Sequence, residues 1–142
     1  MIHTDIKLNW LFSEQLLQED ASLSLGWIEI KTQNKDFLLF EKNLCMLFLT
    51  LSDLLEFLSN NNRSFNWVGV DGSDIYSLTK YREILIIQKE GEKLILDYTS
   101  FRESIIKTST NLINYLLKNN SRVKEESAFI DLSNCLENLI CK

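Results

Sequence analysis

Two hydrophobic runs of strand length in the second half of the chain are joined by a Glu-Gly pair. Residues 83–89 and 92–98 each have the pattern of a strand, and Glu90-Gly91 forms the turn between them. The first run has hydrophobic side chains on both faces, which is typical of an inner strand of a sheet. Ser100 and Glu103 then follow at the spacing of a capping box. The pattern therefore predicts a hairpin that leads directly into a capped helix.

Shorter stretches of the same kind predict further strands before this hairpin. Strands are expected at residues 6–10, 22–30, 37–40, 65–70 and 75–78. Gly26 is expected to form a bulge in the second of these. The second and third strands are expected to pair across a polar turn at 33–36, and the turn at 71–74 joins the last two. Residues 12–20 fit either a helical turn or a loop.

Residues 44–49 are hydrophobic at all positions, so periodicity alone allows two interpretations. The run fits a strand that is buried on both faces, or the first part of one buried helix over 44–58. Thr50 and Asp53 have the spacing of an N-cap and its reciprocal acid, which favours a strand followed by a short helix. One face of that helix carries Leu51, Leu54, Leu55 and Leu58.

The helix that begins at Ser100 has a hydrophobic stripe that is expected to lie on the sheet. The stripe consists of Phe101, Ile105, Leu112 and Leu116. A last segment also repeats hydrophobic residues at helical spacing, namely Phe129, Leu132, Leu136, Leu139 and Ile140. We find no domain boundary and predict a single α+β domain over residues 1–142. Its core is expected to be an antiparallel meander of about six to eight strands, with a short helix between two strand groups and a C-terminal helix on one face.

Charge narrows the classes of partner. The chain has 142 residues and a net charge of −5, and its 15 Lys and Arg residues are spread thinly. Nucleic-acid-binding surfaces concentrate Lys and Arg on one face, so this class of function is disfavoured. An acidic surface suits a basic partner, although the same charge also suits a protein that only needs to stay in solution.

Cysteine usage and hydropathy indicate the compartment. The three Cys residues are scattered without a Cys-x-x-Cys pair, which argues against a disulfide framework and against a zinc site. The longest hydrophobic run, 44–49, is too short to span a bilayer, and no basic stretch precedes a hydrophobic segment at the start. We therefore expect a cytoplasmic protein without a metal, a cofactor or a membrane partner.

Few residues could carry catalysis. His3 is the sole imidazole and is expected on a mobile terminus, where it cannot serve a Ser or Cys nucleophile. Ser77 and Lys80 have the spacing of a serine acyl-transfer pair, but they lie in a strand-like context and no Lys-Thr-Gly follows. The four Gly residues do not have the spacing of a phosphate-binding loop.

Carboxylates offer one further site for chemistry. Asp71, Asp74 and Glu83 could hold a divalent cation or act as an acid and base pair. The alternative is that Asp-Gly-Ser-Asp is ordinary turn chemistry, because Asp and Ser bond their own backbone and Gly accepts positive φ. The scarcity of His, Cys and Gly favours a protein that is not an enzyme.

A mixture of aromatic and acidic residues marks a candidate partner-binding region. Trp67, Tyr76 and Tyr81 can present large amphipathic surfaces, and Asp71 and Asp74 add negative charge beside them. The alternative is that Trp67 belongs to the core and that both Tyr residues lie at the edge of the sheet.

The order of elements resembles that of small bacterial immunity proteins of polymorphic and contact-dependent toxin systems. The resemblance covers residues 5–118 and is carried by the short helix at 50–56, the strand at 94–98 and the helix from Phe101. It implies a cytoplasmic antitoxin that binds one cognate toxin domain and blocks it. No functional residue carries over, because interfaces differ between members of such families.

A second resemblance leads to an alternative function. Acidic chains of this length also occur among the secretion chaperones of type III systems, which are α/β homodimers. Their long opening helix is absent from the pattern here, because residues 6–10 predict a strand. The amphipathic segment 129–140 supports self-association, since it could pair with a second copy. The sequence thus favours a toxin-neutralising binding protein, with a chaperone or self-associating domain as the alternative.

Overall fold

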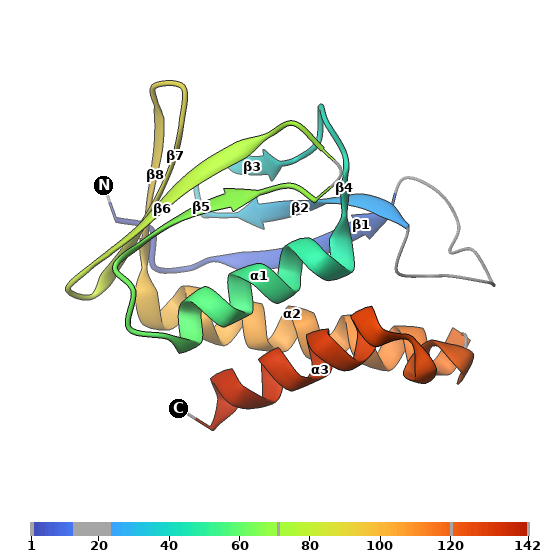
Figure 1. Cartoon of the computed structure of the whole chain (residues 1–142). Coiled ribbons are helices and arrows are strands. Elements are labelled where there is room, and N and C mark those ends of the chain that lie inside the picture. The colour runs from blue at the N-terminus through green and yellow to red at the C-terminus, as the bar shows by residue number, and fades with distance from the viewer. Residues whose placement is uncertain (1, 13–23, 71, 120, 142) are drawn as a thin grey trace.

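The computed structural model describes residues 2–12, 24–70, 72–119 and 121–141 (Figure 1). The strands are β1 (Lys7–Phe12), β2 (Leu25–Lys31), β3 (Asp36–Leu39), β4 (Cys45–Met46), β5 (Ser64–Val68), β6 (Ile75–Tyr81), β7 (Ile84–Lys89) and β8 (Glu92–Asp97). The helices are α1 (Leu47–Ser59), α2 (Tyr98–Asn119) and α3 (Ser127–Ile140), with a 3₁₀ helix, η2, at Ser121–Glu125. The expected helical turn or loop at 12–20 falls, after Phe12, outside the described residues.

The described strands form two antiparallel sheets, and the helices lie together along one side of them (Figure 1). This confirms the predicted α+β class, with a short helix between two strand groups and helices packed on the strands. The prediction of a single meander is wrong in one respect, because the described strands form two sheets of four strands each. The first has the order β1-β2-β3 with β4 also paired to β2, and the second has the order β5-β6-β7-β8. Along the chain, α1 lies between the strands of the first sheet and those of the second.

In the first sheet, the outer edge of β1 is covered by α2. The backbone N–H of Leu8 donates to the hydroxyl oxygen of Ser104 at 2.9 Å, and the hydroxyl of Thr108 donates to the carbonyl oxygen of Leu8. The expected bulge at Gly26 is wrong, since β1 and β2 pair without interruption from Lys7↔Lys31 to Phe12↔Gly26. Gly26 instead permits a close approach, because a Cβ there would lie 2.2 Å from the carbonyl oxygen of Leu11.

In the second sheet, the hairpin of β7 and β8 has the predicted turn. Glu90 and Gly91 have φ values of 47° and 87°, and positive φ at both central residues is typical of a type I′ turn. β7 is an inner strand, as predicted. His3 pairs with the outer edge of β8 through its backbone, with bonds of 3.0 Å to Ile95 and 2.9 Å to Asp97. The expectation that His3 lies on a mobile terminus is therefore wrong.

The start of α1 differs from the prediction. The helix begins at Leu47, directly after the two-residue strand β4. A strand does precede the helix, but residues 47–49 of the expected strand are helical. Thr50 lies inside the helix rather than at its N-cap. Its hydroxyl oxygen accepts from the N–H of Val70 at 3.1 Å, and its carbonyl oxygen accepts from Nε1 of Trp67 at 2.8 Å. The expected face of Leu51, Leu54, Leu55 and Leu58 is buried.

The other two helices also bury their predicted stripes, with two corrections. Asp97 rather than Ser100 caps α2, because its carboxylate accepts from the backbone N–H of Ser100 at 2.9 Å and from the Ser100 hydroxyl at 2.8 Å. In α3 the stripe packs on α1 and α2 of the same chain, except for Ile140, which is exposed. No helix in the described ranges combines the length and hydropathy needed to cross a membrane.

Candidate functional site

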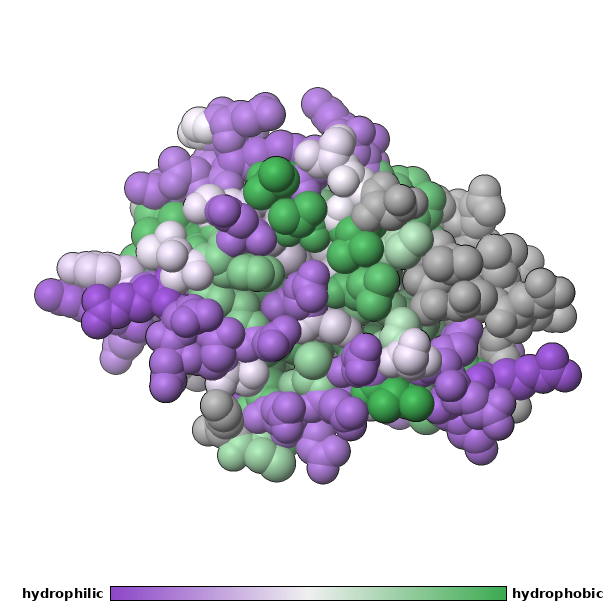
Figure 2. Space-filling model, in the orientation of Figure 1, coloured by the Kyte–Doolittle hydropathy of each residue, from purple (hydrophilic) through white to green (hydrophobic). Residues whose placement is uncertain are grey.

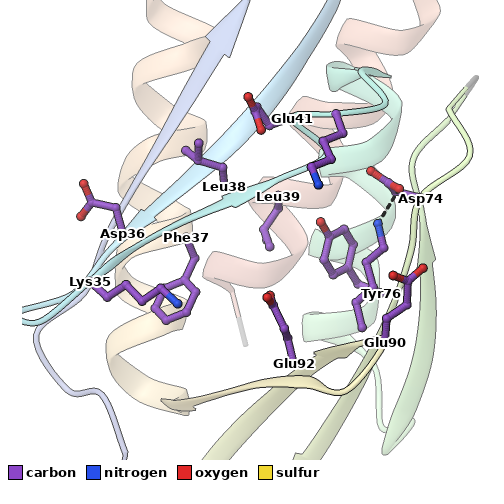
Figure 3. A pocket seen from close by; sticks show the side chains of 12 residues that line it. Lys35, Asp36, Phe37, Leu38, Leu39, Glu41, Asp74, Tyr76, Glu90 and Glu92 are labelled. Atoms are coloured by element: carbon purple, nitrogen blue, oxygen red, sulfur yellow. Dashed lines mark hydrogen bonds and ion pairs between the residues drawn. The ribbon is translucent and has the colours of Figure 1, made fainter.

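A groove of about 430 Å³ lies between β3 and the second sheet (Figure 3). It is lined by Lys35, Asp36, Phe37, Leu38, Leu39, Glu41, Lys42, Asp74, Tyr76, Lys89, Glu90 and Glu92, and we call it the β3 groove. A hollow of about 180 Å³ shares several of these residues and extends the lining to Ile87, Lys93 and Leu94. The groove is thus built from two strand groups that α1 and β5 separate along the chain.

The β3 groove follows the open edge of a strand. β3 is the last strand of its sheet, and residues from both of its faces, such as Phe37 and Leu38, line the groove. Backbone groups along antiparallel strands alternate in direction. The backbone N–H and C=O groups of Leu8 point away from β2, toward α2. Those of its partner Ile30 therefore point toward β3, where Ile30 pairs with Phe37. The N–H and C=O groups of Leu38 are therefore directed away from β2, along the groove.

Tyr76 closes one end of this edge. The backbone N–H of Phe40, just beyond β3, donates to the Tyr76 hydroxyl oxygen at 3.2 Å. The Phe40 ring also meets the rings of Trp67 and Tyr76 edge to face, each with centroids 4.9 Å apart. Phe40 has a φ of 66°, a left-handed conformation that is rare for a bulky residue and that ends the strand. Burial raises the pKa of Tyr76, which favours the protonated hydroxyl.

An ion pair fixes the wall opposite β3. The Asp74 carboxylate accepts from Nζ of Lys89 at 2.5 Å and from the side-chain amide of Asn43 at 3.1 Å. Burial alone would raise the pKa of Asp74, but the hydrogen bonds from Lys89 and Asn43 together lower it below its usual range. The same hydrogen bond has the opposite effect on Lys89, whose pKa it raises above its usual value. Asp74 and Lys89 thus hold each other charged and in place (Figure 3).

The remaining charges on the rim of the groove are mainly negative. Beside the Asp74–Lys89 pair, the lining of the groove has four carboxylates, of Asp36, Glu41, Glu90 and Glu92, and two ammonium groups, of Lys35 and Lys42, and the adjoining hollow adds the ammonium group of Lys93. The floor is hydrophobic, with Phe37, Leu39, Ile87 and Leu94. This arrangement can hold hydrophobic side chains below and cationic groups above.

The surface continues from the groove onto the outer face of the second sheet. A hollow of about 510 Å³ shares Asp74, Lys89 and Glu90 with the groove and adds Ile75 and other residues of that face. Ile75 pairs with Val68 across β5 and β6, and their side chains are 53% and 42% exposed. Figure 2 shows hydrophobic side chains gathered over β5 and β6 on the face turned to the viewer. A partner that covers the groove can therefore also cover apolar surface at Ile75.

The structure separates the five residues expected to bind a partner. Asp74 and Tyr76 line the β3 groove. The prediction that Trp67 binds a partner is wrong, because its side chain is 0% exposed and belongs to the core. Tyr81 is 55% exposed but lies at the far end of β6 from Asp74 and does not line the groove. Asp71 falls outside the described residues.

The candidate catalytic combinations do not assemble where their members lie among the described residues; Asp71 falls outside them. Ser77 and Lys80 lie on β6 three residues apart, hence on opposite faces. Lys80 instead donates from Nζ to two backbone carbonyl oxygens at the end of α1, those of Phe57 at 2.8 Å and Asn60 at 2.9 Å. The whole of β6 separates Asp74 from Glu83. Across the described ranges, no group of three or more His, Cys, Asp and Glu side chains is placed to hold a metal ion.

The three cysteines are free thiols in different environments. Cys45 is buried, Cys135 is half-buried and Cys141 is exposed. Burial raises the pKa of the Cys45 thiol to about 11, so it is protonated at neutral pH. Its Sγ lies 3.6 Å from the carbonyl oxygen of Gly26. Cys45 is therefore a core residue rather than a nucleophile.

Sequence reasoning missed the β3 side of the groove. Lys35, Phe37 and Glu92 have no local pattern that distinguishes them from ordinary strand and turn residues. They become a site only because β3 lies beside the second sheet, a contact between distant segments. Comparison with protein families, curated proteins and solved structures finds no match to this chain.

Proposed function

We propose that this chain is a non-enzymatic protein-binding module, and that it acts as an immunity protein that neutralises a toxin domain. The observation that carries the proposal is the β3 groove, which combines an open strand edge, a hydrophobic floor and an acidic rim. These are features of surfaces that recognise other polypeptides.

Two properties of the sequence support a toxin as the partner. The order of elements resembles that of immunity proteins of polymorphic toxin systems. The net charge of −5 suits a basic partner, because opposite charges steer association and favour the correct complex. We propose that the chain binds such a toxin domain in the cytoplasm and blocks its active site or a surface that it needs.

Neither alternative is favoured by a specific contact. Self-association was suggested by the amphipathic segment 129–140, but α3 packs this stripe on α1 and α2 of the same chain. The sequence suggests catalysis by Asp71, Asp74 and Glu83. Asp74 and Glu83 lie beyond opposite ends of β6, and Asp71 falls outside the described residues. We therefore propose the binding function alone.

Co-expression with the product of the adjacent gene tests the proposal. Cells that produce that product alone should stop growing, and growth should return when this chain is produced with it. The two proteins should then copurify as a complex of defined stoichiometry. Growth arrest that persists despite folded chain, together with separate elution of the two proteins, would contradict the proposal.

A further inference from the structure

We infer that the β3 groove binds an extended segment of the partner that carries Lys or Arg, and that this segment adds to β3 as a further strand. The inference rests on the proposed binding function and names the part of the chain and the chemistry that would perform it. It follows from the backbone edge, the alternation of the lining and the charge of the rim, taken in turn.

The backbone edge of β3 is less covered than two other edges of the sheets. The edge of β1 is bonded by the hydroxyl groups of Ser104 and Thr108 on α2. The edge of β8 is paired with the backbone of His3. On β3, Tyr76 bonds Phe40 just beyond the strand, while Leu38 directs its N–H and C=O groups into the groove. Proteins usually cover or shorten such edges because they pair readily with another chain.

The lining suits a segment with alternating side chains. Successive residues of an extended strand point to opposite sides. A strand beside β3 would direct one set of side chains toward the hydrophobic floor at Leu39 and Leu94, and the other set toward the carboxylates of the rim. Hydrophobic residues therefore suit the first set and Lys or Arg the second. A helix satisfies its own backbone groups and would leave the edge of β3 unused.

The charges select the sign of the partner segment. Asp74 and Lys89 neutralise each other, which leaves four carboxylates against the three ammonium groups of Lys35, Lys42 and Lys93 around the groove and its hollow. An acidic segment would bring like charges together at Glu90 and Glu92, whereas a basic one pairs with them. Exposed charge pairs also make this binding sensitive to salt.

Synthetic peptides provide the direct test. The probe is a fluorescent seven-residue peptide of alternating Lys and Val, titrated with the full chain at low ionic strength and followed by anisotropy. We expect saturable binding and a shift of the Leu38 amide resonance. The same peptide with Glu in place of Lys should show no saturation. A version with alternate backbone nitrogens methylated along one edge should bind about tenfold more weakly, because it cannot donate to β3.

Charge variants give the matched comparison. Glu90→Gln with Glu92→Gln removes two rim carboxylates, and Glu56→Gln with Glu137→Gln removes two exposed carboxylates from the helices α1 and α3. The first pair should weaken the Lys-Val peptide about fivefold, and the second pair should leave it unchanged within about twofold.

Three results would overturn the inference. These are equal binding of the methylated peptide, equal weakening by the two variant pairs, and no binding of the Lys-Val peptide at concentrations on the order of 1 mM. The failures can be told apart. Protection of cells without any effect of the rim variants would leave the proposed function in place and remove the strand-addition inference. Binding of the Lys-Val peptide without protection of cells would leave the strand-addition inference in place and remove the proposed function.

Discussion

The substitution Tyr76→Phe isolates one hydrogen bond at the end of the β3 groove. The Tyr76 hydroxyl oxygen accepts from the backbone N–H of Phe40 at 3.2 Å, and both residues are buried. Phenylalanine keeps the ring and its edge-to-face contact with Phe40, at 4.9 Å between centroids. The variant therefore removes the acceptor and leaves a buried N–H group without that partner.

The expected cost is about 1–3 kcal/mol in the free energy of unfolding, the penalty for an unsatisfied buried backbone donor. Tyr81→Phe is the matched control on the same strand. Tyr81 is 55% exposed, so removal of its hydroxyl should change the free energy of unfolding by no more than about 0.5 kcal/mol. The difference between the two variants measures the contribution of the hydrogen bond, since both changes delete the same atom.

Urea unfolding followed by tryptophan fluorescence provides the measurement, with the slope of the free energy against urea compared between variants. Equal slopes with a lower midpoint for Tyr76→Phe alone would support the reasoning. The reasoning is refuted if Tyr76→Phe unfolds at the same urea concentration as the parent chain, or if Tyr81→Phe loses as much stability.

Three further predictions follow from contacts outside this hydrogen bond. Lys80→Met should lower the free energy of unfolding by about 1–2 kcal/mol, because it removes two hydrogen bonds to carbonyl oxygens at the end of α1. Lys93→Met, at an exposed position, is the control and should leave the free energy of unfolding unchanged. Equal losses of the two variants in urea unfolding would contradict this. Cys45, with its pKa near 11, should react with a thiol reagent at pH 8 far more slowly than exposed Cys141, as mass spectrometry of the labelled peptides can measure. Asp74→Asn should destabilise the chain at pH 7. The lowered folded-state pKa of Asp74 adds stability above its unfolded value of about 3.9, and this stability is lost as the pH falls through the folded value. The variant should therefore show a shallower loss of stability below pH 4, and parallel acid limbs would refute the prediction.

Local signals made part of the fold predictable. Glu90-Gly91 between two hydrophobic strands predicts its hairpin, since positive φ at two successive residues suits few sequences. The stripe that includes Phe101 and Leu112 predicts the buried face of α2, because helical periodicity is readable over many residues. The start of α1 differs from the prediction, since Thr50 fits a cap by spacing but is bonded to Trp67 on β5 and to Val70 in the turn that follows β5.

The groove could be predicted only in part. Asp74 and Tyr76 were selected because acidic and aromatic residues cluster there. Trp67 was selected for the same reason, but its side chain fills the core beside Phe40, and no local pattern distinguishes a core Trp from an interface Trp. The open edge of β3 could not be predicted from the sequence, because it depends on which strands pair. Nor does the sequence show that α2 bonds the edge of β1 and that His3 pairs with the edge of β8.

Hydrogen exchange of the chain, alone and bound to the toxin domain that we propose as its partner, tests the central account most directly. The account predicts that binding slows exchange at residues 35–42 and 88–94, with the strongest effect at the Leu38 amide, while α1 and α3 exchange at unchanged rates. Slowed exchange on α1 and α3 with unchanged rates along β3 would contradict it.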